Sequence, residues 1–97
     1  MTVLNFSYAT IKDAGKFREY VVAAKVLLDE AGVDVVVRGD FFDVMRGDNM
    51  NPHVVAVFRY HDKEAAKRFY ASPSYLKLVP LRDAACDMQI VLYDEMV

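Results

Sequence analysis

The segment of residues 62–87 constrains the fold more than any other part of the chain. Asp62 is predicted to cap a helix at its start. Ser72 precedes a proline, so it leaves the helical region and caps a new turn in which Pro73 takes the first helical position. Pro80 would break a continuous helix, so a kink or restart is expected beside it. The segment therefore predicts consecutive short helices, followed by a final strand.

The remaining periodicities complete the order of elements. Alternating or continuous apolar residues predict strands at 3–9, 33–38, 53–60 and 88–93, and a 3.6-residue apolar period predicts a long helix after Asp13. The order βαββαβ is the ferredoxin-like split unit, an α+β fold with an antiparallel four-stranded sheet and helices on one face.

Two of the predicted strands are apolar on both faces. The runs that carry this pattern are Val33, Val35, Val36 and Val37, and residues 54–58. Helices on one side bury only one face, whereas a strand open to water alternates with polar residues. We therefore expect a homodimer that buries the second face by packing sheet on sheet.

Composition limits the class of protein. The chain has 97 residues, 55% of them hydrophobic, and a net charge of −2. This length predicts a single domain over residues 1–97. The charges are mixed and form no basic stripe, so nucleic-acid binding is not expected. No leader or membrane-spanning run is present in the sequence, and we expect a soluble cytoplasmic protein.

The chain resembles the DUF1330 family of small dimeric α/β-barrel proteins over nearly its whole length. The residues that carry the resemblance are Tyr20, Arg38-Gly39, residues 54–60, Ala65-Ala66 with Phe69-Tyr70, Ser72-Pro73-Ser74-Tyr75, Leu81-Arg82 with Ala85, and residues 90–93. The chain departs from the family pattern at Ser74, where an acid is usual, and at Glu95-Met96, where a glycine often follows the last strand. The resemblance implies two sheets packed face to face, in a fold shared with antibiotic-biosynthesis monooxygenases, muconolactone isomerases and haem-binding chlorite dismutases.

Two arginines are candidate ligand-binding residues. Arg38 and Arg82 each lie at the edge of an apolar element, and a guanidinium suits bidentate recognition of a carboxylate or enolate. The alternative, which we favour, is a structural ion pair with Asp62, Asp83 or Asp87.

Four further polar residues are candidates for a pocket between the helices and the sheet. The rings of Tyr70 and Tyr75 flank the Ser-Pro break and can wall a pocket with their hydroxyls inside, although core packing explains them equally well. Asn5 and Ser7 are polar positions on an otherwise apolar strand, so they either line a cleft or lie at a wet edge.

The remaining reactive side chains give weaker indications. His53 is a weak candidate for an acid or base, and a surface role is favoured. His53 and His61 flank one strand roughly 26 Å long, so they cannot share a metal. No motif for a metal or a cofactor is present, and none is expected. Cys86 is predicted to be a small core residue. The acidic pairs Asp29-Glu30 and Asp94-Glu95 are predicted to be solvated.

Taken together, the sequence indicates a homodimer that binds a small acidic or aromatic molecule between sheet and helices. The alternative is a cofactor-independent monooxygenase, isomerase or lyase of the dimeric α/β-barrel type, although fold alone does not determine function.

Overall fold

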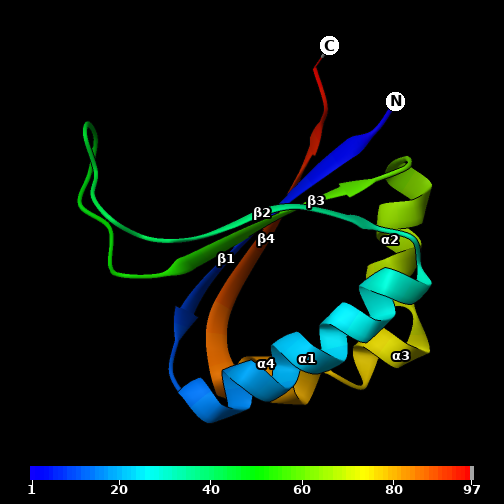
Figure 1. Cartoon of the computed structure of the whole chain (residues 1–97), viewed down its shortest axis with the longest axis horizontal. Helices are drawn as coiled ribbons and strands as arrows, with labels where there is room; N and C mark the ends of the chain where they lie inside the picture. The colour runs from blue at the N-terminus through cyan, green and yellow to red at the C-terminus, as the bar shows by residue number, and fades with distance from the viewer. Residues whose placement is uncertain (97) are drawn as a thin grey trace.

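The computed structural model describes residues 1–96 and contains one antiparallel sheet with the strand order β2-β3-β1-β4. Helices cover one face of this sheet (Figure 1). The elements in chain order are β1 (Val3–Ile11), α1 (Ala14–Glu30), β2 (Asp34–Asp40), β3 (Val54–Tyr60), α2 (Lys63–Ala71), α3 (Pro73–Leu76), α4 (Val79–Ala85) and β4 (Cys86–Asp94). The predicted ferredoxin-like α+β fold is confirmed, with three short helices in the place of its second helix.

The predicted helix caps form at the expected residues. The side chains of Asp13 and Asp62 accept backbone N–H groups at the starts of α1 and α2. The Ser72 side chain caps α3 with Pro73 in its first turn. After α1, Gly32 adopts a φ of +70°, a left-handed conformation that favours glycine. Capping residues therefore determine where α1, α2 and α3 begin, and Gly32 follows the end of α1.

β1, β2 and β4 extend past their predicted bounds, whereas β3 begins one residue later than predicted, at Val54. β1 and β4 pair as far as Ile11 and Cys86, which are partners in the register, so each strand is extended by the other. β2 continues to Asp40 through an irregularity between Val35 and Val37. Pairing with a neighbouring strand extends these elements beyond the residues whose side chains alternate.

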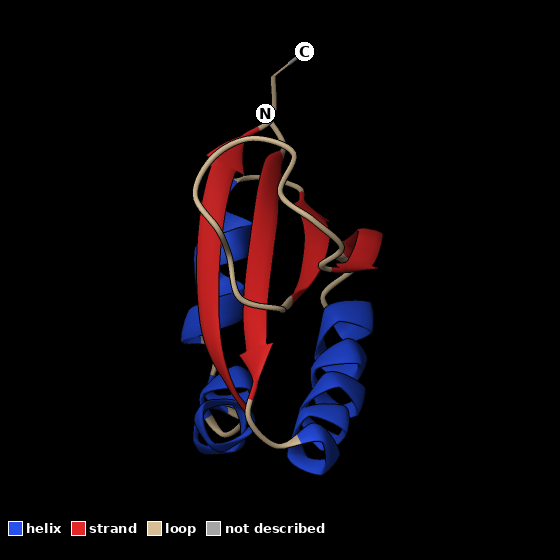
Figure 2. Ribbon diagram, turned by 90° about the vertical axis from the view of Figure 1, so that its left-hand side faces the viewer, coloured by secondary structure: helices blue, strands red, loops and turns tan. Residues whose placement is uncertain are grey.

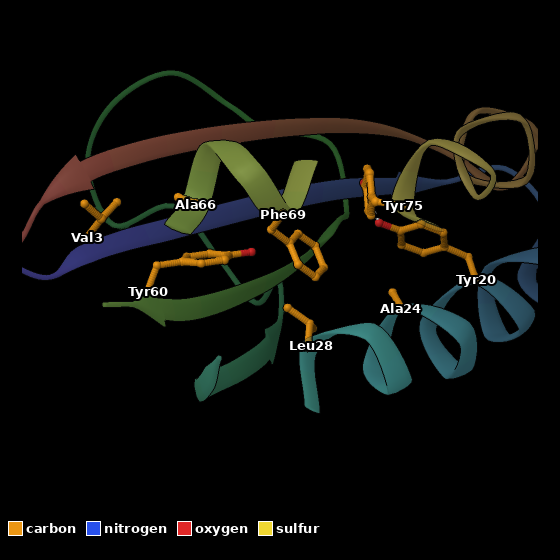
Figure 3. Packing of buried hydrophobic residues seen from close by; sticks show 8 residues of the cluster. All are labelled: Val3, Tyr20, Ala24, Leu28, Tyr60, Ala66, Phe69 and Tyr75. Atoms are coloured by element: carbon orange, nitrogen blue, oxygen red, sulfur yellow. Dashed lines mark hydrogen bonds between the residues drawn. The ribbon is translucent and has the colours of Figure 1, made fainter. Parts of the chain in front are cut away.

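The hydrophobic core lies between the helices and the inner face of the sheet, the face that the helices cover (Figure 3). Its buried members are Val3, Tyr20, Ala24, Leu28, Tyr60, Ala66, Phe69 and Tyr75. α1 contacts α3 and α4 and lies beside the group formed by α2, α3 and α4, as Figure 2 shows. Cys86 is buried at the start of β4, in line with its prediction as a small core residue.

The outer face of the sheet, opposite the helices, is largely apolar, and no helix of residues 1–96 covers it. Its side chains include Leu4, Phe6, Tyr8, Val37, Val57, Val91 and Tyr93. Val37 and Tyr93 are about half exposed, at 54% and 50%. The loop of residues 41–53 projects beyond the sheet (Figure 1) and exposes Phe42 and Met45 almost completely.

Glu95 corrects one prediction. The sequence indicated a solvated acidic pair, but the Glu95 carboxylate accepts hydrogen bonds from Arg59 at 2.8 and 3.0 Å and from the Thr2 hydroxyl at 2.6 Å. The bond from Arg59, then that from Thr2, lowers the pKa of Glu95 to about 2. Sequence spacing did not reveal this contact because Arg59 lies on β3, 36 residues earlier.

Candidate functional site

A cavity of about 490 Å³ lies between the inner face of the sheet and α1. Its floor contains small side chains, Ser7 and Ala9 from β1 and Ala56 from β3. Most of the rest of the wall is apolar, with Phe17 and Val21 from α1 among its members. Small residues under a helix leave space that larger side chains would fill, so the cavity originates in the choice of residues at these three floor positions.

Three tyrosines from three different helices meet at this cavity. Tyr20 of α1, Tyr70 of α2 and Tyr75 of α3 all line it. The Oη atoms of Tyr20 and Tyr75 are 2.8 Å apart and share a hydrogen bond. The rings of Tyr70 and Tyr75 are perpendicular, with centroids 5.0 Å apart. Figure 3 shows the Tyr20 side chain extending from α1 with its hydroxyl directed at Tyr75.

Arg82 stands behind Tyr75 and does not line the cavity. Its Nη1 atom donates to Tyr75 Oη at 3.1 Å, and its Nε atom donates to Asp83 Oδ1 at 3.0 Å. Burial lowers the pKa of the Arg82 guanidinium, but the contacts with Tyr75 and Asp83 outweigh burial, and the net shift is upward. Arg82 is therefore a permanent cation that orients Tyr75.

Asn5 supports the site from the sheet. It is fully buried on β1, and its Nδ2 atom donates to Tyr70 Oη. The Ser7 hydroxyl donates to Asn5 Oδ1 at 3.2 Å. Ser7 faces the cavity, whereas Asn5 lies behind Tyr70. Both residues therefore lie on the inner face, and neither lies at a wet edge.

Burial keeps the tyrosine hydroxyls protonated. It is the largest cause that raises the pKa of Tyr20, Tyr60 and Tyr70, and neighbouring tyrosines contribute to the increase. Tyr60 Oη has no hydrogen-bond partner among the described residues, and Tyr60 does not line the cavity. At neutral pH the cavity-lining residues Tyr20 and Tyr70 are therefore phenols rather than phenolates.

The rim of the cavity carries the charged groups. Arg38 and Asp40 come from β2, and Lys25 comes from α1. Lys25 also contacts Asp29 one helical turn later, at 3.2 Å. Arg38 is exposed and makes no salt bridge within residues 1–96, so its guanidinium is free to meet a ligand at the rim.

His53 lies elsewhere. It lines an open groove between the 41–53 loop and the ends of β1 and β4. Its Nδ1 atom is 2.7 Å from the Asn51 carbonyl oxygen, and its ring lies 5.0 Å from that of Phe41. His53 is absent from the wall of the inner cavity, so the structure does not bring it together with the tyrosines.

The sequence-predicted residues thus fall into three groups. Ser7, Arg38, Tyr70 and Tyr75 line one cavity, Asn5 and Arg82 hold members of its wall, and His53 is remote. Their role in binding stays a prediction.

Sequence reasoning missed Tyr20 and Met88 as lining residues. The signal for Tyr20 was a tyrosine on the apolar stripe of a helix, because a buried hydroxyl needs a partner. No comparable signal marked Met88.

Metal and membrane features are absent from the part of the chain that the structure describes. No group of three His, Cys, Asp or Glu side chains in residues 1–96 is placed to hold a metal ion. Over the same residues, no helix combines the length and apolarity that crossing a membrane requires.

The order and pairing of the elements define the class to which this chain belongs, the α+β proteins with a ferredoxin-like fold. The chain belongs to the family described as a domain of unknown function, DUF1330, whose pattern it matches over residues 3–96. No protein with a curated description matches the chain in sequence.

Solved structures share this fold at low sequence identity. A protein of unknown function from Rhodopseudomonas palustris has a TM-score of 0.86 and 17% identity, covering 99% of this chain and 83% of that one. SnoaB from Streptomyces nogalater, described as a cofactor-independent oxygenase, has a TM-score of 0.73 and 15% identity, covering 99% and 94%. A dabb family protein with a ferredoxin-like fold from Mesorhizobium loti has a TM-score of 0.65 and 16% identity, with 100% of both chains covered. At these identities the similarity concerns the fold alone.

Proposed function

We propose that this protein is a homodimer that binds a small acidic or aromatic molecule in the cavity between the sheet and α1. The observation that carries the proposal is the convergence of Tyr20, Tyr70 and Tyr75 on a mostly apolar wall. Ligand pockets typically enclose about 300–1,000 Å³ and combine apolar walls with a few placed polar groups. A cavity of about 490 Å³ with three phenols has this character.

The proposed binding residues divide according to their position. Ser7, Tyr70 and Tyr75 face the ligand, and Arg38 meets an acidic group at the rim. Asn5 and Arg82 act through Tyr70 and Tyr75, whose hydroxyls they contact.

A thermal-shift screen of small carboxylates and phenols tests the proposal. A ligand that binds only the folded state raises the melting temperature. Val21→Trp should abolish the response to any hit, because Val21 lines the cavity and the indole would fill it. Val22→Trp is the matched control, since the neighbouring side chain is 62% exposed and does not line the cavity. Equal loss in both variants would argue against this site.

The homodimer rests on the apolar outer face of the sheet. A contiguous exposed apolar surface of this kind marks an interface. The protomer mass is 11.0 kDa, so light scattering at micromolar concentration should give twice that value. Val37→Asp, on the outer face, should give the protomer mass, whereas Val22→Asp on the outward side of α1 should stay dimeric. A wild-type mass of one protomer would refute the dimer.

The second candidate function is a cofactor-independent enzyme of the monooxygenase, isomerase or lyase type. It is supported by the Tyr75–Arg82 hydrogen bond, because an oriented phenol beside a cation can stabilise developing negative charge on an enolate. His53 is the weak candidate for proton transfer and would have to act from the separate outer groove. Mass spectrometry and NMR of each screening hit after incubation in air would detect turnover, including isomerisation that leaves the mass unchanged, and hits unchanged by both methods would favour binding alone.

A further inference from the structure

The hydrogen bonds of the tyrosine cluster have a direction, and this direction restricts which ligands fit. Arginine has donors and no acceptor. Because Arg82 Nη1 donates to Tyr75 Oη, the Tyr75 hydroxyl accepts that bond, and its own proton points to another partner. The cluster therefore begins at a group that can only donate.

One hydroxyl proton is left over in the Tyr20–Tyr75 pair. The two hydroxyls bring two protons, and the 2.8 Å bond between them uses one. If Tyr75 donates to Tyr20, the Tyr20 proton has only Met88 Sδ as a partner among residues 1–96, at 4.0 Å. A thioether is a weak acceptor. If Tyr20 donates instead, the Tyr75 proton is the free one. Both tyrosines line the cavity, so in either arrangement the free O–H donor belongs to a cavity-lining residue.

The charges nearby have the matching sign. The guanidinium carbon of Arg82 is 5.9 Å from the centroid of the Tyr75 ring. The Tyr75 ring therefore already has a cation beside it. At the rim, Lys25 is paired with Asp29, and Arg38 and Asp40 carry one charge of each sign, so the rim adds no net negative charge against an anion. A cavity walled by tyrosines can also serve as an aromatic cage for an ammonium group. In this cavity, the positive charge of Arg82 and the free tyrosine O–H donor both disfavour binding of an ammonium group.

We propose that the cavity selects an apolar molecule that carries an anionic oxygen, a carboxylate or phenolate, and that the Tyr20–Tyr75 pair donates its free proton to this oxygen. The inference rests on the proposed binding function and narrows its ligand class. An anionic acceptor gains a charge-assisted hydrogen bond, which a neutral or cationic group of the same shape does not gain.

Calorimetric titration with three probes on one carbon skeleton tests the ligand class. Cinnamate, cinnamyl alcohol and cinnamylammonium present an anion, a neutral hydroxyl and a cation. Cinnamate should bind at least about tenfold more tightly than cinnamyl alcohol, and cinnamylammonium should bind most weakly. Equal or tighter binding of the alcohol or the cation would overturn the selection of anions while leaving the cavity a binding site. Failure of all three probes to bind would count against the proposed function itself, and with it this inference.

The shared proton predicts a pattern among variants that a merely structural role would not produce. Tyr20→Phe leaves the Tyr75 proton free, and Tyr75→Phe leaves the Tyr20 proton free, so each single variant keeps one donor. The double variant has no donor left from this pair, and its fold-loss of cinnamate affinity should exceed the product of the two single fold-losses. Cinnamyl alcohol should show a smaller excess. A double-variant fold-loss equal to the product of the two single fold-losses would contradict the shared-proton arrangement.

Tyr60→Phe is the matched control for these substitutions. Its hydroxyl is buried but has no hydrogen-bond partner within the described residues and does not line the cavity. Cinnamate affinity should stay within about twofold of the wild type. Circular dichroism confirms that each variant is folded, and the three-probe comparison on the wild-type protein tests the inference even if the double variant fails to fold.

Discussion

The two faces of the sheet differ in both cover and polarity. The inner face is covered by helices, yet it carries buried polar groups, Asn5 and Ser7, beneath a cluster of tyrosines. The outer face is open within the protomer, yet it is largely apolar, with Phe6, Val37 and Val91 among its side chains. The polar inner face suits a ligand with hydrogen-bonding groups, whereas the apolar outer face suits another protein surface. Each face therefore indicates a different kind of partner.

A charge inside the core should give the largest effect. Ala66 is fully buried on α2 within the core cluster, so Ala66→Asp places an unpaired carboxylate in an apolar environment. We expect a loss of several kcal/mol of unfolding free energy, enough to prevent stable folding of a domain of this size. Urea denaturation measures it. Ala84→Asp, at an exposed helical position, is the control and should cost less than about 1 kcal/mol.

A charge on the outer face should cost less and should act on assembly. Val57 lies at the centre of the outer face and is 7% exposed in the protomer. Val57→Asp should lower the unfolding free energy by about 2 kcal/mol and should yield monomers in light scattering. Val36 is 44% exposed beside the irregularity of β2, so Val36→Asp should be milder. A dimer with an unchanged melting temperature in the Val57 variant would mean that this face is not the interface.

Substitution of Arg82 should give an effect of intermediate size on the inner side. Arg82→Ala removes the bonds to Tyr75 and to the exposed Asp83, and we expect a loss of about 1 kcal/mol. Arg82→Lys should recover part of this loss, because lysine keeps the charge but lacks the planar fork. Melting temperatures of both variants, with and without a screening hit, provide the measurement. A ligand response that is lost in the lysine variant at unchanged stability would instead assign Arg82 to binding.

Acid should produce the smallest effect, where Glu95 after β4 meets Arg59 near the end of β3. The pKa of Glu95 is about 2 in the folded protein against an ordinary value of 4.5, chiefly because of the hydrogen bond from Arg59. A lowered pKa stabilises the folded state above the unfolded-state value, so this contribution is present above pH 4.5 and is lost as the pH falls toward 2. Glu95→Gln should flatten the decrease in melting temperature over that interval. An identical pH profile in the variant and the wild type would contradict the role of this ion pair.

The capping residues and apolar periods explain why the fold was predictable. Asp13, Asp62 and Ser72 act within one turn of their own helices, so their effect is readable from adjacent residues. The continuous apolar strands likewise predicted an uncovered face without reference to other segments. Strand ends were less predictable, because Ile11 and Cys86 extend each other through pairing across the sheet.

The candidate site was only partly predictable because its contacts join distant segments. Tyr70 and Tyr75 attracted attention through the Ser-Pro break between them, whereas Tyr20 joins Tyr75 across 55 residues of sequence. An ion pair of Arg82 with an aspartate was one of the two interpretations offered, and Arg82 does contact Asp83. Its bond to Tyr75 depends on how α4 packs beside α3. Glu95 was misread for the same reason.

The sequence by itself determined the order of helices and strands, the capped breaks between helices and the need to cover an apolar sheet face. These properties follow from local backbone preferences and from the period of apolar side chains. Only the tertiary structure decided that small floor residues leave a cavity, that three tyrosines from three helices meet there, and that Arg82 sets the direction of their hydrogen bonds. Such features depend on distances between residues far apart in sequence, which local preferences do not specify.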